Sequence, residues 1–409
     1  MSLNFNPIER RDKVIKSTDF DALSSKLSCF NKNYFSNDPN NDSSLFKSYI
    51  DQLKINLPLL ASNNSLFKSF GNSKFSIQRL LNSNLNENLI KNKFPLINRG
   101  TYIRTKLLDI LIQNFLISNN YENCQIISLG AGSDLRFLNL IKNFSSSSPH
   151  KIIHNFKYIE LEFKESTFIK SFIYLSNPTF RDLIFNSSNF DSSLQYNTNY
   201  NINNINLSTF NIDTIQTNNY LLYPIDLRDK NQFTQFIQYL KNSTTIKINF
   251  NHPTLIFSEL STCYMSSTDS NVLLQSFQSA FPNGIISLYE PISLNDRFGE
   301  MMSNNLLKRK IFISTLNDYP TLLSQIDRFQ SQITHFNKIL SSDMLFIYNN
   351  WLTSNEKLRL SRLEFLDELE EWNLLASHYC LIVGTYGHSS LINTDFINQI
   401  QSLKWQIIH

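Results

Sequence analysis

Cysteine is scarce in this chain of 409 residues, and long apolar runs are missing from it. No apolar stretch approaches the length of a membrane span, and the N-terminus has no apolar core of a signal peptide. The four cysteines form no CxxC pair and are widely separated, at Cys29, Cys124, Cys263 and Cys380. Such scattered cysteines are typical of reduced, buried thiols. We therefore expect a cytoplasmic protein that does not enter the membrane.

Neither sign of charge is in large excess, and the common metal and nucleophile motifs are also missing. The 37 basic residues nearly balance the 34 acidic ones, so the bulk electrostatics demand neither nucleic acid nor a membrane surface. His150 and His154 are four residues apart but lack the HExxH context of a zinc site. No GxSxG nucleophile elbow occurs. We expect no metal and no covalent intermediate.

The segment Gln125–Arg136 (QIISLGAGSDLR) is the most informative feature that is present. Its first half is apolar and indicates a buried strand, and Gly130 and Gly132 indicate a turn at the end of that strand. Ser133 or Asp134 is a suitable N-cap for the helix that is predicted to follow. A strand, a glycine turn and a helix form the ligand site at the carboxyl edge of open α/β sheets. The segment therefore predicts a nucleotide-type pocket.

The missing phosphate-binding residues narrow the choice of ligand. A dinucleotide fingerprint has a third glycine three residues after the second, and here that position is Leu135. The chain also has no Gly-Lys-Ser/Thr sequence of a phosphate-binding loop. Both absences favour a cofactor that has a nucleoside but no phosphate, and S-adenosylmethionine fits this description. The alternative is a glycine turn in an unrelated α/β protein, and the neighbouring strands distinguish the two.

Acidic residues follow three further predicted strands, where an α/β sheet places its ligand. One strand ends in Glu162, whose two carboxylate oxygens suit two ribose hydroxyls. Glu160 has the same parity and is the nearest competitor. The next strand runs into Asp226 and Leu227, a carboxylate and a backbone amide that suit an adenine ring. The fourth ends in Glu259. Three acids in successive strand–helix units favour a binding function over solvated loop charges.

The chain divides into a helical N-terminal region and an α/β core with helical additions. Residues 1–120 have helical apolar spacing and are predicted to be mainly helical. The core is predicted to occupy 121–409, with helical additions at about 297–378. A segment at about 186–219 is dominated by Asn, Ser and Thr. We expect this insertion to be disordered or loosely packed and to carry no chemistry.

The last part of the chain is predicted to contain three helices and a strand. The helices are expected at Arg297–Ile313, Tyr319–Phe336 and Arg359–His378, where apolar residues recur at helical spacing. The strand is expected at Tyr379–Thr385 (YCLIVGT), at the edge or in the interior of the sheet.

These patterns together resemble one enzyme family. The chain is similar to the leucine carboxyl methyltransferases, which methylate the C-terminal leucine of the protein phosphatase 2A catalytic subunit. The combination of RG-x-x-x-R, LGAG and a late DRFG is specific to that family. The similar stretches follow the family's order: INRGTYIRT (97–105), QIISLGAGSDLR (125–136), KYIELEF (157–163), YPIDLRD (223–229), LIFSELSTCYMS (255–266), YEPISLNDRFGEMM (289–302) and RLEFLDELEEWNLLASHYCLIVGT (362–385). The resemblance implies an α/β fold, a class I S-adenosylmethionine-dependent methyltransferase with a Rossmann-like doubly wound sheet, a helical N-terminal lid and C-terminal helical additions.

The resemblance also implies roles for individual residues. Arg104 is similar to the arginine that contacts the methionine carboxylate of the cofactor, and Glu162 stands where many members have an aspartate for the ribose. Tyr264 stands where the family lines the active site with a tyrosine. The catalytic pair would be Arg104 and Tyr264. The cofactor-binding set would be Lys26, Arg104, Gly130, Glu162, Asp226, Leu227 and Glu259.

The implied reaction needs no general base from the protein. A C-terminal carboxyl group has a pKa of roughly 3.5, so it is ionised at neutral pH and needs no general base. Arg104 and Tyr264 are the candidates to hold it, by a charge and by a neutral hydrogen bond. Arg104 could instead form a structural salt bridge, and Tyr264 could be a half-buried core residue. Arg297 of DRFG is a further candidate for substrate contact, and its alternative role is a salt bridge that fixes the start of its helix. The implied partner is the tail of the phosphatase 2A catalytic subunit, bound by a monomer.

Three other functions stay open at this point. They are a methyltransferase of the same fold that acts on a small molecule, a sister branch that acts on a modified transfer-RNA base, and a non-catalytic protein that binds the phosphatase. The sister branch carries a β-propeller repeat, which this sequence does not show. A non-catalytic binder has no need for the complete predicted set of Arg104, Gly130, Glu162, Asp226 and Glu259.

Overall fold

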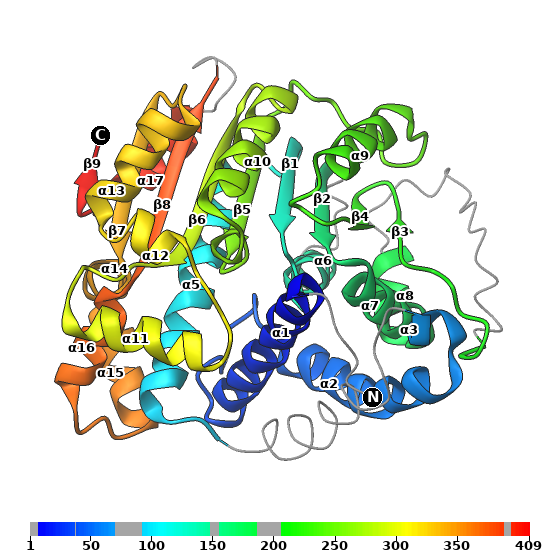
Figure 1. The fold of residues 1–409 in the computed structure, drawn as a ribbon, viewed down its shortest axis with the longest axis horizontal. Coiled ribbons are helices and arrows are strands. Elements are labelled where there is room, and N and C mark those ends of the chain that lie inside the picture. Colours follow the sequence, from blue (N-terminus) through cyan, green and yellow to red (C-terminus); the bar gives the residue numbers. More distant parts are fainter. Residues whose placement is uncertain (1–6, 37, 70–91, 148–154, 186–205, 388–393) are drawn as a thin grey trace.

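A nine-stranded sheet forms the centre of the described part of the protein (Figure 1). The computed structural model describes residues 7–36, 38–69, 92–147, 155–185, 206–387 and 394–409. In these residues the strand order is β3-β4-β2-β1-β5-β6-β8-β7-β9. The strands are β1 (Glu122–Leu129), β2 (Asn155–Glu162), β3 (Ile215–Gln216), β4 (Tyr220–Pro224), β5 (Thr254–Glu259), β6 (Gly284–Pro291), β7 (Lys338–Asp343), β8 (Tyr379–Tyr386) and β9 (Ile407–Ile408).

The middle of the sheet is parallel. Strands β4, β2, β1, β5 and β6 run in the same direction, and β8 lies antiparallel between β6 and β7. Every residue of β6 is buried, as expected for a parallel strand that is covered on both faces. This is the Rossmann-like, doubly wound sheet of class I methyltransferases, so the predicted fold class is confirmed. The strand expected at Tyr379–Thr385 is β8, and its place is interior.

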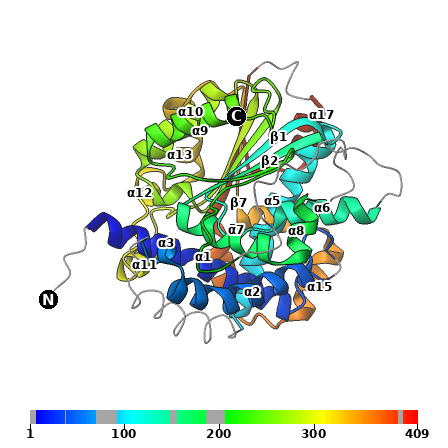
Figure 2. The same cartoon turned by 90° about the vertical axis from the view of Figure 1, so that its right-hand side faces the viewer.

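Helices cover both faces of the sheet (Figure 2). One core cluster joins the sheet to α1–α3, α5–α8 and α14–α17, and a second joins the opposite face to α9, α10, α13 and η4. No helix among the described residues is long and apolar enough to cross a membrane. The helices are α1 (Pro7–Asn31), α2 (Ser43–Asn63), α3 (Ser65–Ser69), α5 (Pro95–Ser118), α6 (Arg136–Ser147), α7 (Lys164–Ser176), α8 (Pro178–Phe185), α9 (Lys230–Asn242), α10 (Ser267–Ala280), α11 (Arg297–Lys308), α12 (Thr315–Asp318), α13 (Leu322–Asp327), α14 (Met344–Trp351), α15 (Ser354–Leu363), α16 (Leu369–Ser377) and α17 (Thr394–Ser402), with short turns η3 (Thr262–Tyr264) and η4 (Arg328–Ile333).

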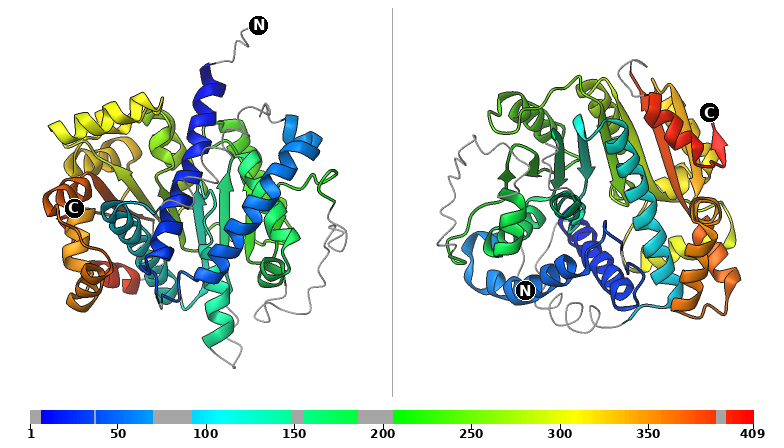
Figure 3. Two further views of the ribbon diagram at one scale, coloured as in Figure 1. Left: turned by 90° about the horizontal axis from the view of Figure 1, so that it is seen from below. Right: turned by 180° about the vertical axis from the view of Figure 1, so that it is seen from behind.

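Helix α1 crosses the carboxyl ends of the central strands. Figure 1 shows α1 below the ends of β1 and β2, and the view from below in Figure 3 shows it running across them. Within the region predicted as a lid, α5 packs into the core through Leu107, Leu108 and neighbouring residues, which are fully buried, and the C-terminal half of α1 adds Leu23, Leu27 and Phe30 to the same core cluster. Helix α5 therefore belongs to the layer that covers the sheet, and α1 is the element that roofs its edge.

The helix predicted at Arg359–His378 is divided in two. Helix α15 ends at Leu363 and α16 begins at Leu369. Between them Glu364 has an extended backbone and accepts hydrogen bonds from Asn98 Nδ2 (2.8 Å) and Tyr34 Oη (3.1 Å). These contacts turn Glu364 toward the N-terminal helices, which a continuous helix would not allow. The sequence pattern missed the break because apolar residues keep their spacing across it.

The expectation of a loose insertion at 186–219 is wrong for its second half. Residues 206–219 are described, whereas 186–205 lie outside the described residues. Phe210 is buried and its ring contacts those of Phe168 and Phe172, with centroids 5.1 and 5.0 Å away. Asn64 Nδ2 donates to the carbonyl oxygens of Leu207 (2.8 Å) and Phe210 (2.9 Å). The segment then forms edge strand β3, so it is part of the core.

Candidate active site

A cavity of about 490 Å³ lies at the carboxyl ends of β1, β2, β4 and β5, between the sheet and α1. This volume is within the range of small-molecule sites, roughly 300–1,000 Å³. The structure brings all the predicted site residues to its walls: Lys26, Arg104, Gly130, Glu162, Asp226, Leu227, Glu259 and Tyr264. Because they come from seven separate segments, only the folded chain assembles them.

The glycine turn after β1 is fixed by close neighbours. Gly130 and Gly132 have positive φ angles of 65° and 50°. Residues that carry a Cβ atom are strained in this backbone conformation. A Cβ atom on Gly130 would overlap with Ser261 Oγ, from the loop after β5. The amide of Gly132 donates to Glu162 Oε2 at 2.8 Å. Both glycines are therefore needed for the turn to meet its neighbours.

Asp19 of α1 closes over the same turn. Its Oδ1 accepts from the Ser133 amide at 2.9 Å and its Oδ2 from Ser133 Oγ at 2.6 Å. Burial raises the pKa of Asp19 despite these hydrogen bonds. Sequence reasoning missed Asp19, since nothing in the pattern of α1 marks it; its role follows from the packing of the helix on the turn.

Glu162 is a buried carboxylate at the end of β2. In addition to the Gly132 amide, its own chain supplies the Phe163 amide, which donates to Oε1 at 2.7 Å. Burial raises the pKa of Glu162 to about 7, although both amides lower it. Glu160, the competitor, pairs with Lys170 Nζ (2.6 Å) and accepts from Tyr220 Oη (2.7 Å) outside the cavity lining. Of the two, Glu162 is therefore the acid at the cavity.

Asp226 is held by an ion chain that reaches α1. Arg228 donates to both carboxylate oxygens of Asp226, from Nε at 2.8 Å and from Nη2 at 2.6 Å. The same guanidinium donates to Asp12 of α1 at 2.7 and 2.9 Å. Although partial burial raises it, the hydrogen bonds and charge of Arg228 lower the pKa of Asp226. The loop after β4 is thus tied to the helix that roofs the cavity.

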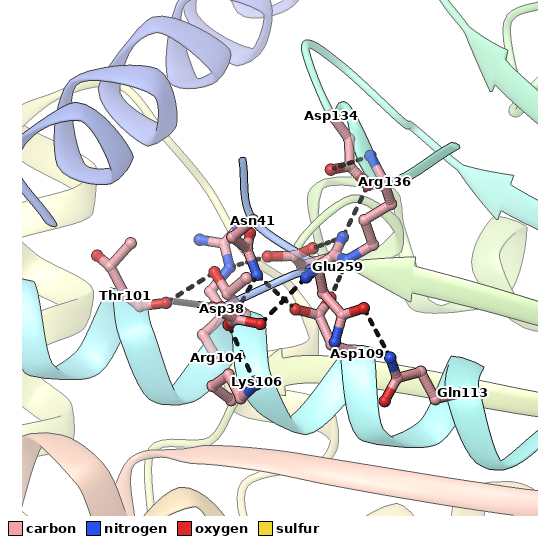
Figure 4. Close-up of polar contacts among 12 residues, drawn as sticks. Asp38, Asn41, Thr101, Arg104, Lys106, Asp109, Gln113, Asp134, Arg136 and Glu259 are labelled. Atoms are coloured by element: carbon pink, nitrogen blue, oxygen red, sulfur yellow. Dashed lines mark hydrogen bonds and ion pairs between the residues drawn. The ribbon is translucent and has the colours of Figure 1, made fainter. Parts of the chain in front are cut away.

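Glu259 joins two arginines (Figure 4). One of its carboxylate oxygens pairs with Arg104 Nε, and the other accepts from Arg136 Nη1 at 2.7 Å. Arg136 also donates to Asp109 (2.8 Å) and Asp134 (2.8 Å). Burial alone would raise the pKa of Glu259, but the charges of Arg136 and Arg104 outweigh it and lower this pKa to about 2. Glu259 is therefore ionised at any physiological pH.

Comparison with known proteins gives the same family as the sequence motifs. The sequence model of the family described as leucine carboxyl methyltransferase matches residues 59–278. The chain is 33% identical to leucine carboxyl methyltransferase 1 of Debaryomyces hansenii, over 98% of this chain and 99% of that protein. It is 31% identical to the Candida albicans protein of that name, over 95% and 96%. The chain belongs to the leucine carboxyl methyltransferase family.

Membership in this family confirms the predicted enzyme class, a carboxyl methyltransferase. Among solved structures, a methyltransferase from Thermobifida fusca aligns with a TM-score of 0.41 at 9% identity, over 76% of this chain and 89% of that one.

The late DRFG motif of this family member acts through residues other than its arginine. Arg297 is exposed and lies outside the cavity lining. Asp296 caps α11 by accepting from the Gly299 amide (2.8 Å) and pairs with His378 Nε2 (3.0 Å). A Cβ atom on Gly299 would overlap with the carbonyl group of Ser293. The motif therefore fixes the start of α11, whose last turn reaches the cavity through Leu306.

Sequence reasoning also missed two aromatic residues of the cavity wall. Tyr289 and Tyr379 line it, with ring centroids 5.8 Å apart and planes inclined by 8°. The guanidinium carbon of Arg104 lies 5.9 Å from the Tyr289 centroid. Tyr289 lies near the carboxyl end of parallel strand β6, as the acidic site residues lie at the ends of theirs. This position in the sequence could have marked Tyr289 as a site residue. Tyr264 lies in η3 on the same cavity, and burial raises its pKa, so this phenol stays neutral.

Proposed function

We propose that this protein transfers a methyl group from S-adenosylmethionine to the α-carboxylate of the C-terminal leucine of the protein phosphatase 2A catalytic subunit, giving a methyl ester. Family membership supports the reaction class. The observation that carries the proposal is the meeting of Arg104, Glu162 and Glu259 at one cavity on the carboxyl edge of the sheet. A monomer suffices, because these residues come from one chain.

The cavity residues fit S-adenosylmethionine. Glu162 is desolvated and each of its oxygens has one backbone donor, so both keep capacity to accept from a ribose diol. Asp226 and Leu227 would flank the adenine ring. Arg104, with its Nε on Glu259, would direct its terminal nitrogens to the cofactor's carboxylate. When bound, the cofactor supplies an electrophilic methyl group.

The chain's own task is to hold and align a carboxylate. A terminal carboxyl group is ionised at neutral pH, so proton removal is not part of the task. Tyr264 stays protonated because burial raises its pKa, and it can donate a neutral hydrogen bond to the tail carboxylate. A neutral donor replaces water while leaving the oxygen nucleophilic. Alignment of two reactants in a closed site supplies several kcal/mol of rate enhancement.

The apolar end of the cavity suits a leucine side chain. Gly100, Met344 and Leu375 line this end, one helical turn before Arg104 on α5. A Cβ atom on Gly100 would lie 4.0 Å from Leu375 and from the Met344 methyl group. A methyl group at position 100 would therefore pack against these apolar side chains, where we place the leucine side chain of the substrate.

The test is methyl transfer from labelled S-adenosylmethionine to purified phosphatase 2A catalytic subunit, with and without its terminal leucine. The proposal predicts label on the intact subunit alone, released by mild base as an ester must be. Label on both forms would place the methyl group elsewhere. No label on either, with cofactor binding measured separately, would direct the search to a small molecule or a modified transfer-RNA base. Cofactor binding absent altogether would favour a non-catalytic binder.

A further inference from the structure

We propose that Arg136 is a positioning residue for methyl transfer, which holds the Glu259 carboxylate so that Glu259 in turn fixes the guanidinium of Arg104. This inference rests on the proposed function, because it concerns the S-adenosylmethionine site of that reaction. Arg136 lies in the QIISLGAGSDLR segment, where sequence reasoning gave it no role.

Arg136 itself is held rigidly. It is the first residue of α6, directly after the glycine turn, and its side chain is 5% exposed. Its Nε donates to Asp109 Oδ1 at 2.8 Å, and its Nη1 donates to Asp134 Oδ2 at 2.8 Å and to Glu259 Oε2 at 2.7 Å. A guanidinium is planar and its donors have fixed directions, so three carboxylates in different directions define its orientation.

The contacts of Arg136 form a closed ring that returns to the helix of Arg104. Arg104 and Asp109 both lie on α5, Glu259 ends β5, and Arg136 begins α6 (Figure 4). The ring runs from Arg104 to Glu259, to Arg136 and to Asp109. Among the described residues, Arg104 is the other side chain that pairs with Glu259, so without Arg136 the carboxylate could rotate with Arg104. The ring therefore connects the glycine turn, which precedes Arg136, to Arg104 at the cavity and fixes their relative positions.

The ring also sets the charge on Glu259. Three cations face this carboxylate from three helices: Lys26 of α1, Arg104 of α5 and Arg136 of α6. Asp109 and Asp134 lie beyond Arg136, and Tyr289 lies beside Arg104. Burial raises the pKa of Glu259, and the charge of Arg136 is the strongest influence that lowers it. Removal of Arg136 should therefore raise this pKa from about 2. An uncharged Glu259 would no longer pair with Arg104.

The test measures S-adenosylmethionine binding by calorimetry to the wild-type protein and to Arg136→Gln and Arg136→Lys, between about pH 5 and 8. Arg136→Gln is expected to weaken binding by about tenfold or more, the value of a charged hydrogen bond. The loss should grow as the pH falls, because Glu259 then binds a proton in addition to Glu162. Arg136→Lys keeps the charge, so it should restore the wild-type pH profile with incomplete affinity.

The matched control is Arg328→Gln. Arg328 is a fully buried arginine that pairs with Glu290 at 2.9 Å, outside the cavity lining. This variant should lower the unfolding temperature while leaving the dissociation constant and its pH profile unchanged. If Arg136→Gln does not fold, the double variant Arg136→Gln/Asp109→Asn also removes the unpaired buried charge and takes its place.

A folded Arg136 variant with the wild-type dissociation constant and pH profile would overturn the inference. An equal effect of Arg328→Gln on binding would also overturn it, since the effect would then be one of general stability. A wild-type protein that binds no S-adenosylmethionine contradicts the proposed function instead, so the two failures are distinguishable.

Discussion

Glu162 lies where its charge is costly, because burial raises its pKa to about 7 even though two backbone amides donate to it. A carboxylate accepts from two ribose hydroxyls, whereas a protonated carboxyl group has fewer free lone pairs. Cofactor binding should therefore weaken as the pH falls through about 7, by up to about tenfold per pH unit.

Glu162→Gln removes this titration. We expect weaker binding at pH 8 and no change with pH between about 5 and 8, because an amide does not ionise there. Calorimetric titration with S-adenosylmethionine measures both. If cofactor binding to the Glu162→Gln protein still weakens as the pH falls, a group other than Glu162 is responsible for the titration.

Gly100 gives a prediction about substrate choice. Its missing Cβ would contact Trp372, Leu375 and Met344 at 3.9–4.0 Å, which is ordinary packing distance. Gly100→Ala should therefore be tolerated and should stabilise α5 by about 0.5–1 kcal/mol. Gly100→Val adds methyl groups to the slot, so KM for a leucine-ended tail peptide should rise about tenfold while cofactor affinity stays constant. An unchanged KM would place the leucine side chain elsewhere.

At the residue scale, strand ends were predictable and contact-defined roles were not. Glu162, Asp226 and Glu259 follow apolar strands, and a parallel sheet brings such residues to one edge. The role of Arg136 depends on Asp109, 27 residues earlier in the chain on another helix. Asp19 depends likewise on Ser133. A single sequence holds no signal for pairs of this kind.

At the scale of elements, α1 is held over the cavity by ion pairs along its length. Asp12 pairs with Arg228, Lys16 with Glu165, and Asp21 with Arg309. The first pair is bidentate and partly buried, whereas Asp21 and Arg309 are about half exposed. Exposed pairs contribute little to stability, about 0–1 kcal/mol, so the Asp12–Arg228 pair should contribute more than the Asp21–Arg309 pair.

Arg228→Gln should therefore loosen α1 and release Asp226 as well. We expect faster release of the cofactor and a binding constant that depends less on salt than that of the wild-type protein. Stopped-flow release of S-adenosylhomocysteine at low and high salt measures both effects. Arg309→Gln is the matched control and should change neither by more than about twofold; equal effects of the two variants would refute the ranking.

The insertion gives a prediction about stability. Phe210 is 6% exposed and packs on two phenylalanine rings, so Phe210→Ala should lower the free energy of unfolding by about 3–5 kcal/mol. Thr209→Ala, at the exposed neighbouring position, should change it by less than about 0.5 kcal/mol. Urea unfolding compares them. A small effect at Phe210 would mean that 206–219 is loosely packed after all.

Elements with strong periodicity were predictable, and interruptions were not. The strand at 254–259 ends at the predicted residue, Glu259, and the strand at 379–386 was predicted to within one residue, because apolar runs next to turn residues are distinctive. The break between α15 and α16 follows from the contacts of Glu364, and edge strand β3 follows from its antiparallel pairing with β4. Both are tertiary effects that override local pattern.

At the scale of the whole molecule, a doubly wound sheet delivers side chains from far-apart segments to one edge, and α1 covers that edge. The order of apolar strands and acidic strand ends indicated an α/β sheet with a ligand site at its edge, and the family resemblance implied the doubly wound form and the helical lid. The ionic ring that joins α5, β5 and α6 required the folded arrangement. Cofactor and substrate would therefore react in the cavity. The ionic ring of Arg104, Glu259, Arg136 and Asp109 would orient the guanidinium of Arg104 for this reaction.

The most direct measurement is mass spectrometry of the C-terminal peptide of phosphatase 2A catalytic subunit after incubation with this protein and S-adenosylmethionine. The account predicts a gain of one methylene unit that fragment ions place on the α-carboxyl group of the terminal leucine, absent with Arg104→Ala. A methyl group on any other atom of the peptide, or an unmodified tail despite measured cofactor binding, would contradict it.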